Sequence, residues 1–250
     1  MKLITLSITD NIATVALNRP KVNALNKALV EEIQDCFREL AANFDVSSVI
    51  LTGEGSFFSF GLDIPEFLNY SRESFTSFLV KFTDLLKYLF IFPKPVVAAL
   101  NGHTVAGGCM LAIACDYRLM VSEKAKISLN ELTFGSTVFA SGIEMLKFVV
   151  GARIAELILY RGSMFSAEEA KQLGLVDESA TRESLGEASL KVAQDFGSRD
   201  ARAFESLKML LRGQLVDQMN KRDKDSIPEF VDIWYSETTR KNLEKIKIRD

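Results

Sequence analysis

Histidine and cysteine are scarce in this chain, which has one histidine and three cysteines among its 250 residues. The cysteines, Cys36, Cys109 and Cys115, are odd in number and form no CxxC pair. A disulfide framework is therefore not expected, and a reducing compartment is the simplest setting. One imidazole and three scattered thiols do not make the ligand set of a zinc site. We expect no metal, and a histidine base would have to be His103.

The sequence also lacks a strong charge of either sign and a long apolar run. It has 30 Lys and Arg against 33 Asp and Glu, a net charge of −3, which argues against nucleic acid as a partner. Polar residues interrupt the most apolar stretch, 95–120, so no membrane span is expected. The first ten residues fit a strand better than a leader peptide. We expect a cytoplasmic protein, with a mitochondrial location left open.

Segments typical of strands and helices alternate over the first half of the chain. Short β-branched runs between turn residues predict strands, and apolar residues spaced three and four apart predict helices. The alternation to about residue 135 predicts an α/β fold with at least partly parallel strands. Expected strands are 3–8, 12–17, 48–52, 96–100, 116–121 and 125–129, and expected helices are one capped by Asn26, one over 75–89 and one over 109–115.

The second half of the chain has a helical pattern. Residues 166–169 form a capping box ahead of a short helix that Gly174 ends. Further helices are expected over 184–196, 201–211 and 227–243, and the charged tail fits a solvated helix end. The length allows one large domain or two small ones.

Two glycines, Gly107 and Gly108, lie between an expected strand and an expected helix. The first N–H groups of a helix have no partner within it, and the helix dipole adds partial positive charge there. Glycines also let a ligand approach the backbone closely. The step can therefore hold a developing oxyanion, although close packing of helix and strand explains such a pair equally well. Because GxGxxG and GxxxxGK[ST] are both absent, nucleotide binding of those kinds is disfavoured.

Two further segments contain groups that chemistry can use. The loop at 59–63 can present another backbone N–H, or it is a simple turn. Glu131 follows an expected strand in an apolar setting, although a lone glutamate is more often just solvated. Spacing alone does not decide between these interpretations.

Five short motifs occur in an order that is typical of one family. They are the stretches 17–20 with 23–25, 58–63, 94–118, 129–131 and 166–177. In this order they resemble the crotonase superfamily, also called the enoyl-CoA hydratase/isomerase family. The resemblance covers about residues 1–180, is most specific over 95–118, and continues loosely to the C-terminus.

The resemblance implies the crotonase fold, an α/β spiral of ββα units that forms two stacked sheets. It implies a spiral core over residues 1–190 and a C-terminal helical region over 191–250. That helical region is expected to cover the site and to build a homotrimer or a dimer of trimers. Members of the family bind acyl-CoA thioesters, so coenzyme A is part of the substrate and no separate cofactor is expected.

The same resemblance assigns residues to the binding site. By the motif, the two backbone N–H groups that bind the thioester oxygen fall on Phe60 and Gly107. The family usually has alanine at the first position, and the larger Phe60 side chain either narrows the acyl channel or points away from it. Contacts with the coenzyme A ester are implied for Lys21, Val22, Ala24, Phe60, Gly61, Leu62, Asp63, Ile64, Gly107 and Met110.

Carboxylates determine which reaction the resemblance implies. Hydratases of the family position water between two glutamates; the first position is Met110 here and the second is Glu131. Methionine cannot accept a proton or hold water by an ionic hydrogen bond. The pattern resembles Δ3,Δ2-enoyl-CoA isomerases, which use one glutamate, whereas the extra aspartate of dienoyl-CoA isomerases falls on Phe139. An isomerase of fatty-acid metabolism is implied, in which Glu131 moves a proton from C2 to C4 and burial raises its pKa.

Other interpretations remain open on the same residues. Weak hydration or thioester hydrolysis, with Glu131 activating water, is one alternative, and a catalytically silent acyl-CoA-binding protein is another. Glu144 is a candidate second acid, but a place on a helix surface is favoured for it. A structural role is favoured for His103, and Arg118 is expected to pair with Asp116.

Overall fold

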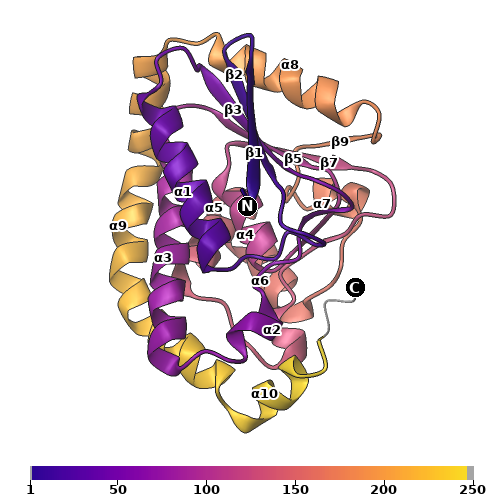
Figure 1. Cartoon of the computed structure of the whole chain (residues 1–250), viewed down its shortest axis with the longest axis vertical. Coiled ribbons are helices and arrows are strands. Elements are labelled where there is room, and N and C mark those ends of the chain that lie inside the picture. Colours follow the sequence, from indigo (N-terminus) through magenta and orange to yellow (C-terminus); the bar gives the residue numbers. More distant parts are fainter. Residues whose placement is uncertain (1, 247–250) are drawn as a thin grey trace.

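Two β-sheets enclosed by helices make up the fold in the computed structural model, which describes residues 2–246 (Figure 1). The larger sheet has six strands, in the spatial order β1 (Ile4–Thr9), β2 (Ile12–Leu17), β3 (Ser48–Gly53), β5 (Val96–Leu100), β7 (Tyr117–Val121) and β9 (Glu178–Ala180). The smaller sheet has three, in the order β4 (Phe57–Ser59), β6 (His103–Val105) and β8 (Ile127–Ser128).

A tight hairpin joins the first two strands, as the sequence predicts. β1 and β2 pair antiparallel, with Thr9 opposite Ile12. The two turn residues, Asp10 and Asn11, both have positive φ angles, a conformation that Asp and Asn tolerate better than most residues. The other pairs of named strands in the two sheets are parallel.

From β3 onward the chain alternates between the two sheets. β3, β5 and β7 lie in the larger sheet, and each is followed by one strand of the smaller sheet, namely β4, β6 and β8. Helical segments then lead back to the larger sheet. This is the spiral of ββα units that the motifs imply. The three-residue strands β4 and β6 are not predicted, because they are too short to show a period of two.

Helices cover the sheets from several sides. They are α1 (Lys27–Ala42), the short α2 (Ile64–Phe67), α3 (Arg72–Phe90), α4 (Gly107–Ala114), the 3-10 helix η1 (Glu131–Phe134), α5 (Ala140–Val150), α6 (Ala152–Arg161), α7 (Ala167–Gln172) and α8 (Leu185–Gly197). Asn26 caps α1 and Ser166 forms the expected capping box of α7. α8 packs on β3, β5 and β7 of the larger sheet. The predicted boundary at residue 190 lies inside this helix.

A single helix of 34 residues, α9 (Ala201–Trp234), replaces the two helices expected over 201–211 and 227–243. Figure 1 shows it running along one edge of the molecule beside α3, and it contacts α3 and α5. Its middle lacks apolar periodicity, but Asp223 accepts hydrogen bonds from the Ser141 backbone and from Lys87. Tertiary contacts thus hold a segment that sequence alone leaves open. The short α10 (Glu237–Leu243) follows, and residues 247–250 of the predicted tail lie outside the described part.

The aromatic stripe of α3 is core packing, as predicted. Phe75, Phe78 and Phe82 are all buried, and the parallel rings of Phe78 and Phe82 stack at 6.1 Å between centroids. Aromatic residues of α9 continue this cluster, since the Phe75 and Trp234 rings lie 4.6 Å apart. The C-terminal helix is therefore joined to the first half of the chain through buried aromatic side chains.

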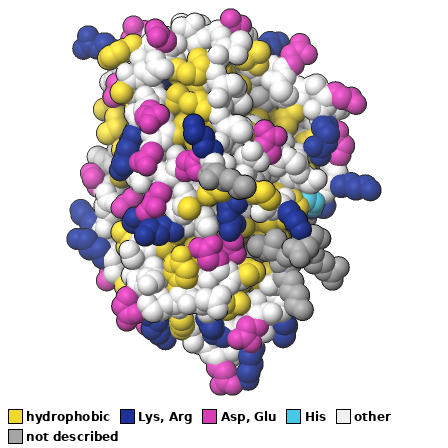
Figure 2. All heavy atoms as spheres, viewed as in Figure 1, with side chains coloured by type: hydrophobic (Ala, Val, Ile, Leu, Met, Phe, Trp, Pro, Cys, Tyr) yellow, Lys and Arg dark blue, Asp and Glu magenta, His cyan; other side chains and the backbone are white. Residues whose placement is uncertain are grey.

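Acidic and basic side chains are interspersed over the face in Figure 2, with no large field of one sign. This pattern agrees with the near balance of charges in the sequence. Among the described residues, no helix combines the length and the apolar character that crossing a bilayer requires.

Candidate active site

The three segments that the motifs single out lie directly after the three strands of the smaller sheet. Residues 60–63 follow β4, residues 106–107 follow β6, and residues 130–131 follow β8. The strands are parallel, with Phe57 opposite His103 and Thr104 opposite Ile127. Because parallel strands end at the same edge of a sheet, segments more than 70 positions apart in the chain meet there.

A cavity of about 220 Å³ lies at this edge. Phe60, Leu62 and Ile64, from the segment after β4, line it together with residues 105–107 and Met110. Buried aromatic side chains of α3 and α9, together with Phe139 just before α5, form an aromatic wall. Glu131 is the one ionisable residue among the described residues that line it. The cavity is therefore an apolar chamber with a single carboxyl group.

Glu131 is the first residue of η1 and is only 5% exposed. Its Oε2 atom has no hydrogen-bond partner among residues 2–246. Burial raises the pKa of the Glu131 carboxyl to about 8, and a backbone hydrogen bond opposes this only in part. The direction agrees with the sequence expectation. A carboxyl group with such a pKa can both take up and release a proton near neutral pH.

Both glycines of the strand-to-helix step are closely packed, Gly108 more tightly than Gly107. A Cβ atom on Gly108 would lie 2.5 Å from the carbonyl oxygen of Ser59, so close packing requires this glycine. Gly107 is the first residue of α4 and lines the cavity. The helix offers no acceptor for the N–H of its first residue. A Cβ atom on Gly107 would lie 3.2 Å from Leu25 and 3.3 Å from Phe82, so packing favours glycine there as well. Gly107 in addition can present its N–H to a ligand in the cavity.

The structure corrects the prediction that the Phe60 N–H binds the thioester oxygen. This N–H donates to the carbonyl oxygen of Val22 over 2.9 Å, so it is already engaged. Phe60 does line the cavity, and its ring packs edge-on against Phe57 at 6.0 Å. The position that the family usually fills with alanine therefore contributes a side chain to the cavity lining.

Leu62, two residues further on, has the better placed N–H. The Leu25 N–H donates to the Gly61 oxygen, and the Asp63 N–H donates to the Leu25 oxygen. Leu25 and Leu62 form a parallel bridge whose bonds run through the residues on either side of Leu62, so the Leu62 N–H points away from Leu25. A Cβ atom on Gly61 would lie 3.0 Å from the Gly107 nitrogen, which brings the Leu62 segment beside α4. The sequence suggested Leu62 as a substrate contact but not as a hydrogen-bond donor.

The structure also brings together the two loops that were expected to contact coenzyme A. The loop containing Lys21, Val22 and Ala24 lies against the loop 60–64 through the Phe60 to Val22 hydrogen bond. In addition, the Ser59 hydroxyl donates to the Asn23 oxygen over 2.7 Å. The loop 60–64 contributes residues to the cavity lining, and the loop 21–24 supports it from behind through these bonds.

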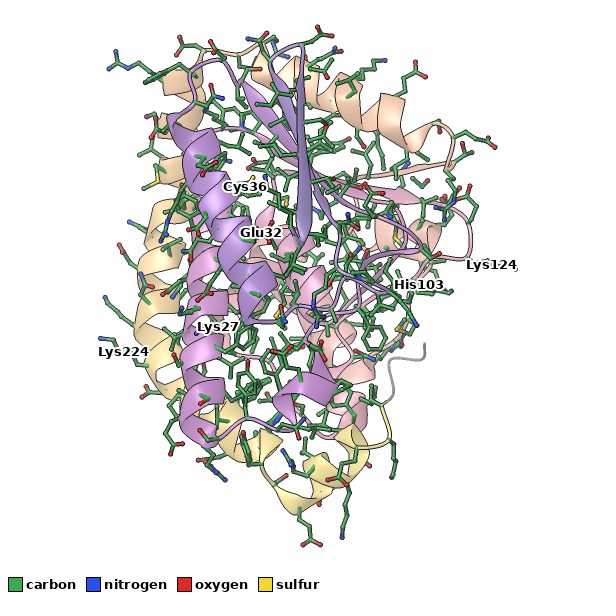
Figure 3. All side chains as sticks on the ribbon, in the orientation of Figure 1. Lys27, Glu32, Cys36, His103, Lys124 and Lys224 are labelled. Atoms are coloured by element: carbon green, nitrogen blue, oxygen red, sulfur yellow. The ribbon has the colours of Figure 1, made fainter. Side chains whose placement is uncertain are left out.

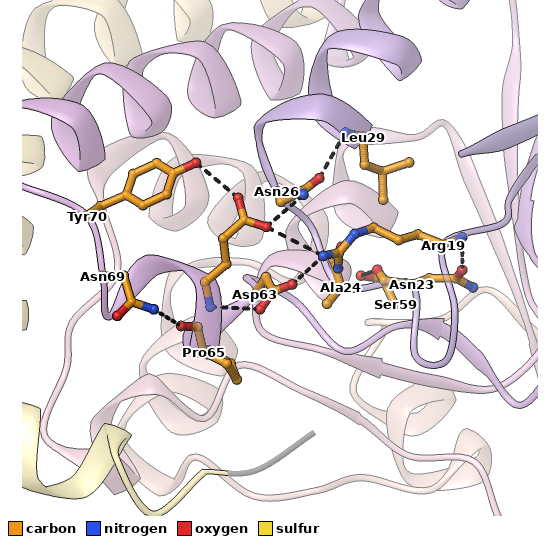
Figure 4. Close-up of polar contacts among 11 residues, drawn as sticks. Arg19, Asn23, Ala24, Asn26, Leu29, Ser59, Asp63, Pro65, Asn69 and Tyr70 are labelled. Atoms are coloured by element: carbon orange, nitrogen blue, oxygen red, sulfur yellow. Dashed lines mark hydrogen bonds and ion pairs between the residues drawn. The ribbon is translucent and has the colours of Figure 1, made fainter. Parts of the chain in front are cut away.

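Arg19 links the two loops through polar contacts (Figure 4). Its guanidinium lies 2.5 Å from the Asp63 carboxylate and 3.5 Å from that of Glu66, and it donates to the Ala24 oxygen over 2.9 Å. Glu66 also accepts from the Tyr70 hydroxyl over 3.0 Å. The network fixes the loop after β4 relative to the loop after β2.

Met110 occupies the position one turn into α4, with its N–H bonded to the Ala106 oxygen over 3.0 Å. It is 2% exposed and lines the cavity together with Glu131. Its sulfur lies 3.4 Å from the place that a Cβ on Gly142 would take. An apolar side chain therefore stands where the motif of a hydratase would have the first glutamate.

Comparison with known proteins identifies the family. The model of the enoyl-CoA hydratase/isomerase family matches residues 7–245. The chain belongs to this family. It is 31% identical to a probable enoyl-CoA hydratase of Bacillus subtilis over 246 residues, which are 98% of this chain and 95% of the relative. It is 28% identical to mitochondrial enoyl-CoA delta isomerase 1 of Mus musculus, over 94% of this chain and 84% of the relative.

A solved structure gives the same result for the fold. Human mitochondrial delta3-delta2-enoyl-CoA isomerase superposes with a TM-score of 0.93 and 25% identity, over 97% of this chain and 95% of that one. The chain therefore has the crotonase fold and is an enzyme of the enoyl-CoA hydratase/isomerase family. The names of its relatives include both hydratases and isomerases, so the reaction has to be argued from the site.

Glu144 does not lie on a helix surface, contrary to the sequence expectation. It is buried, and its carboxylate pairs with Arg222 of α9 and with Lys147 at 3.0 Å. It is not among the residues that line the cavity. Two cations already neutralise this carboxylate, and it is placed to hold α5 against α9.

The ion pair expected between Arg118 and Asp116 is also corrected. Arg118 pairs instead with Asp177 at 2.7 Å. Asp116 pairs with two cations of α9, Lys208 at 2.6 Å and Arg212 at 3.0 Å. Asp116 precedes β7 and Arg118 lies within it, and the partners of both residues come from segments distant in sequence.

His103 has a structural environment, as favoured from the sequence. Its Nδ1 accepts the Lys126 N–H over 3.2 Å, and its ring lies 5.1 Å from that of Phe57. Burial lowers the pKa of His103. Figure 3 places it near the side of the molecule that carries Lys124, and it is not among the residues that line the cavity.

Sequence reasoning missed several residues around Glu131. Asn130 Oδ1 and Ser136 Oγ are buried, line the cavity, and have no hydrogen-bond partner among the described residues. Phe230 and Trp234 reach the cavity from α9. Asn130 lies within the motif 129–131, but only Glu131 was assigned a role there. No motif marks the other three residues, because their positions depend on how α9 and the turn after η1 pack.

Proposed function

We propose that this enzyme shifts the double bond of a 3-enoyl-CoA to give the conjugated 2-enoyl-CoA. The observation that supports this choice is the single carboxyl group in an otherwise apolar cavity. Moving a proton between two carbons of one substrate requires one base that can also act as an acid. Adding water requires, in addition, groups that hold and orient the water, and Met110 cannot do this.

The thioester oxygen is proposed to lie between the N–H groups of Leu62 and Gly107. Both residues line the cavity, and Gly107 starts α4, whose dipole adds partial positive charge at that end. Negative charge develops on this oxygen when a proton leaves C2. One well-placed donor to such an oxygen is worth about 3 kcal/mol of activation free energy.

Glu131 is proposed to carry the proton. Its carboxylate takes a proton from C2, and the electrons of the broken C–H bond form a dienolate whose charge rests on the thioester oxygen. The neutral Glu131 then gives its proton to C4, and the double bond comes to lie between C2 and C3. Atoms and electrons balance without a further reactant. The raised pKa brings the two protonation states of Glu131 close in free energy, which both steps require.

Two substrates separate the reactions of the family. Purified protein is incubated with 3-hexenoyl-CoA and separately with crotonyl-CoA, and the products are resolved by chromatography. We expect 2-hexenoyl-CoA from the first and no 3-hydroxy product from the second. Glu131→Gln should abolish turnover and retain binding of a saturated acyl-CoA, whereas the control Glu156→Gln, on the exposed side of α6, should behave as the parent protein. Retained isomerisation by Glu131→Gln would disprove the mechanism.

Hydration is the second candidate, and one observation favours it. The unpaired Asn130 Oδ1 and Ser136 Oγ beside Glu131 are groups that a water molecule can bridge. If crotonyl-CoA is hydrated as fast as 3-hexenoyl-CoA is isomerised, the enzyme is a hydratase that orients water with neutral groups. Ser136→Ala should then reduce hydration, and under the isomerase proposal it should leave isomerisation within about threefold of the parent.

A further inference from the structure

A second cavity, of about 160 Å³, lies behind Glu131. Its wall is apolar, with Leu129, Val138, Ile143 and Leu159 among the lining residues. At its outer end are Leu132 and Tyr160, which are 55% and 71% exposed. The cavity therefore leads from the neighbourhood of the catalytic carboxyl towards the surface formed by η1 and α6.

The two cavities share part of their lining. Glu131 and Ser136 line both of them. Both residues are nearly fully buried, and the Ser136 N–H donates to the Glu131 carbonyl oxygen over 3.0 Å, which fixes the turn that separates the cavities. The two spaces thus meet at the group that is proposed to carry the proton.

The first cavity has no comparable exit at its aromatic wall. Phe82, Phe139, Phe230 and Trp234 form that wall, and each is at most 3% exposed. Their rings pack in succession, with centroids 6.1 Å, 5.8 Å and 5.9 Å apart. A chain longer than the first cavity would have to displace this packed cluster, and dense cores resist such displacement.

The direction of the acyl chain follows from the proposed reaction. C2 and C4 both have to reach the Glu131 carboxyl, so the part of the chain beyond C4 starts beside Glu131. We propose, on the basis of the isomerase function above, that this part enters the second cavity. The enzyme then takes 3-enoyl-CoA esters of medium and long chain, and Leu159 and Thr137 line the path of the chain through the second cavity.

Affinity should increase with chain length if this is correct. Each methylene that is moved from water into an apolar cavity strengthens binding about fourfold. The increase should continue from hexanoyl-CoA to decanoyl-CoA, because the outer end near Tyr160 is open. Beyond that end the chain reaches solvent, and the increase should stop.

Blocking the second cavity tests the proposal. Leu159→Trp fills it from α6, and Leu157→Trp is the matched control, because Leu157 lies on the same helix, is also half-buried and is not among the residues that line either cavity. Calorimetry with saturated butyryl-, hexanoyl- and decanoyl-CoA measures binding without turnover. We expect Leu159→Trp to lose at least tenfold in affinity for decanoyl-CoA and to keep its affinity for butyryl-CoA, while Leu157→Trp keeps both.

Two results would overturn the proposal. One is equal affinity of parent protein and Leu159→Trp for decanoyl-CoA, and the other is a parent affinity that does not rise beyond butyryl-CoA. Thr137→Phe fills the same cavity from the turn before α5 and replaces Leu159→Trp if that variant does not fold. Since saturated esters do not react, these outcomes are independent of the isomerase assay. A failed isomerase assay with a retained chain-length effect would contradict the reaction and leave the second cavity assigned to the acyl chain.

Discussion

The Phe60 N–H donates to the carbonyl oxygen of Val22 over 2.9 Å. This bond fixes the register between the loop after β2 and the loop after β4. It follows that the N–H available at the cavity is that of Leu62, which lies two residues further and faces away from Leu25. The bond therefore changes the assignment of one oxyanion donor by two positions.

Replacing single amides by esters tests that assignment. An α-hydroxy acid analogue of leucine at position 62 removes the N–H and keeps the side chain. We expect kcat to fall by about 10² to 10³, the usual loss when one oxyanion donor is removed. The same replacement at Phe60 should lower thermal stability and leave kcat within a few fold. The opposite pattern, with kcat lost only at Phe60, would restore the original assignment.

The rate should depend on pH through Glu131. The ionised form is the base, and the pKa of this carboxyl is raised to about 8. We expect kcat/KM for 3-hexenoyl-CoA to rise about tenfold per pH unit between pH 6 and pH 8 and to level off above. Binding of saturated hexanoyl-CoA should vary far less over the same range. A rate that is constant from pH 6 to pH 9 would contradict the assignment of Glu131 as the base.

Glu131 should also lower the free energy of unfolding as the pH rises. In the unfolded chain its pKa is near 4.5, and in the folded protein it is near 8. Below pH 4.5 both the folded and the unfolded state hold the proton, and Glu131 does not reduce the stability of the folded state. As the pH rises towards 8 only the unfolded state releases it, so folding becomes less favourable by about 1.4 kcal/mol per unit.

The glutamine in Glu131→Gln cannot ionise, so this variant should not show the loss of stability towards pH 8. Its melting temperature should exceed that of the parent protein at pH 8, and the difference should shrink towards pH 5. Thermal unfolding at both pH values, with Glu156→Gln as the exposed control, measures the effect. A difference that is the same at both pH values would mean that the two states share one pKa.

Met110 is expected to determine the balance between isomerisation and hydration. Met110→Glu places a second carboxyl group in the cavity beside Glu131, where it can hold water. We expect the ratio of crotonyl-CoA hydration to 3-hexenoyl-CoA isomerisation to rise at least about tenfold, a change that corresponds to about 1.4 kcal/mol. Met110→Gln has a similar shape without the charge and should not raise the ratio. Equal ratios in all three proteins would exclude this role for Met110.

Arg19 should affect binding more than chemistry. It links the loop after β4 to the loop after β2 through Asp63 and Ala24 but is not among the residues that line the cavity. We expect Arg19→Ala to raise the KM for acyl-CoA about tenfold, because a hydrogen-bonded charge pair is lost and the loop loosens. The kcat should stay within about threefold. Arg38→Ala, whose partner Asp35 is exposed, is the control and should leave both constants unchanged.

Much of the site could be predicted because its parts are local in sequence. Gly107 and Glu131 each follow a strand directly, so short motifs suffice to find them. The donor on the loop after β4 could not be placed correctly, since its identity depends on a hydrogen bond to Val22, 38 residues away. Sequence shows which loop is present, but the backbone register between two loops appears only in three dimensions.

The same limit explains the errors in the C-terminal part. Glu144 looks like a surface residue from its helical spacing, and it is buried because Arg222 and Lys147 neutralise it. The middle of α9 has no apolar period, and it is helical because Asp223 bonds to α5 and α3. Periodicity predicts elements that bury an apolar face, and it does not find those held by buried ionic contacts.

The two sheets contribute differently to the framework and to the proposed site. Each of the three strands of the smaller sheet is followed by one segment of the proposed site, whereas the six-stranded sheet supplies much of the buried framework and none of the proposed catalytic groups. Substitutions at the residues just after β4, β6 and β8 can therefore change the reaction without disturbing the large sheet. One fold can therefore support several reactions of acyl-CoA thioesters, because the large sheet can stay unchanged in evolution while the three segments change.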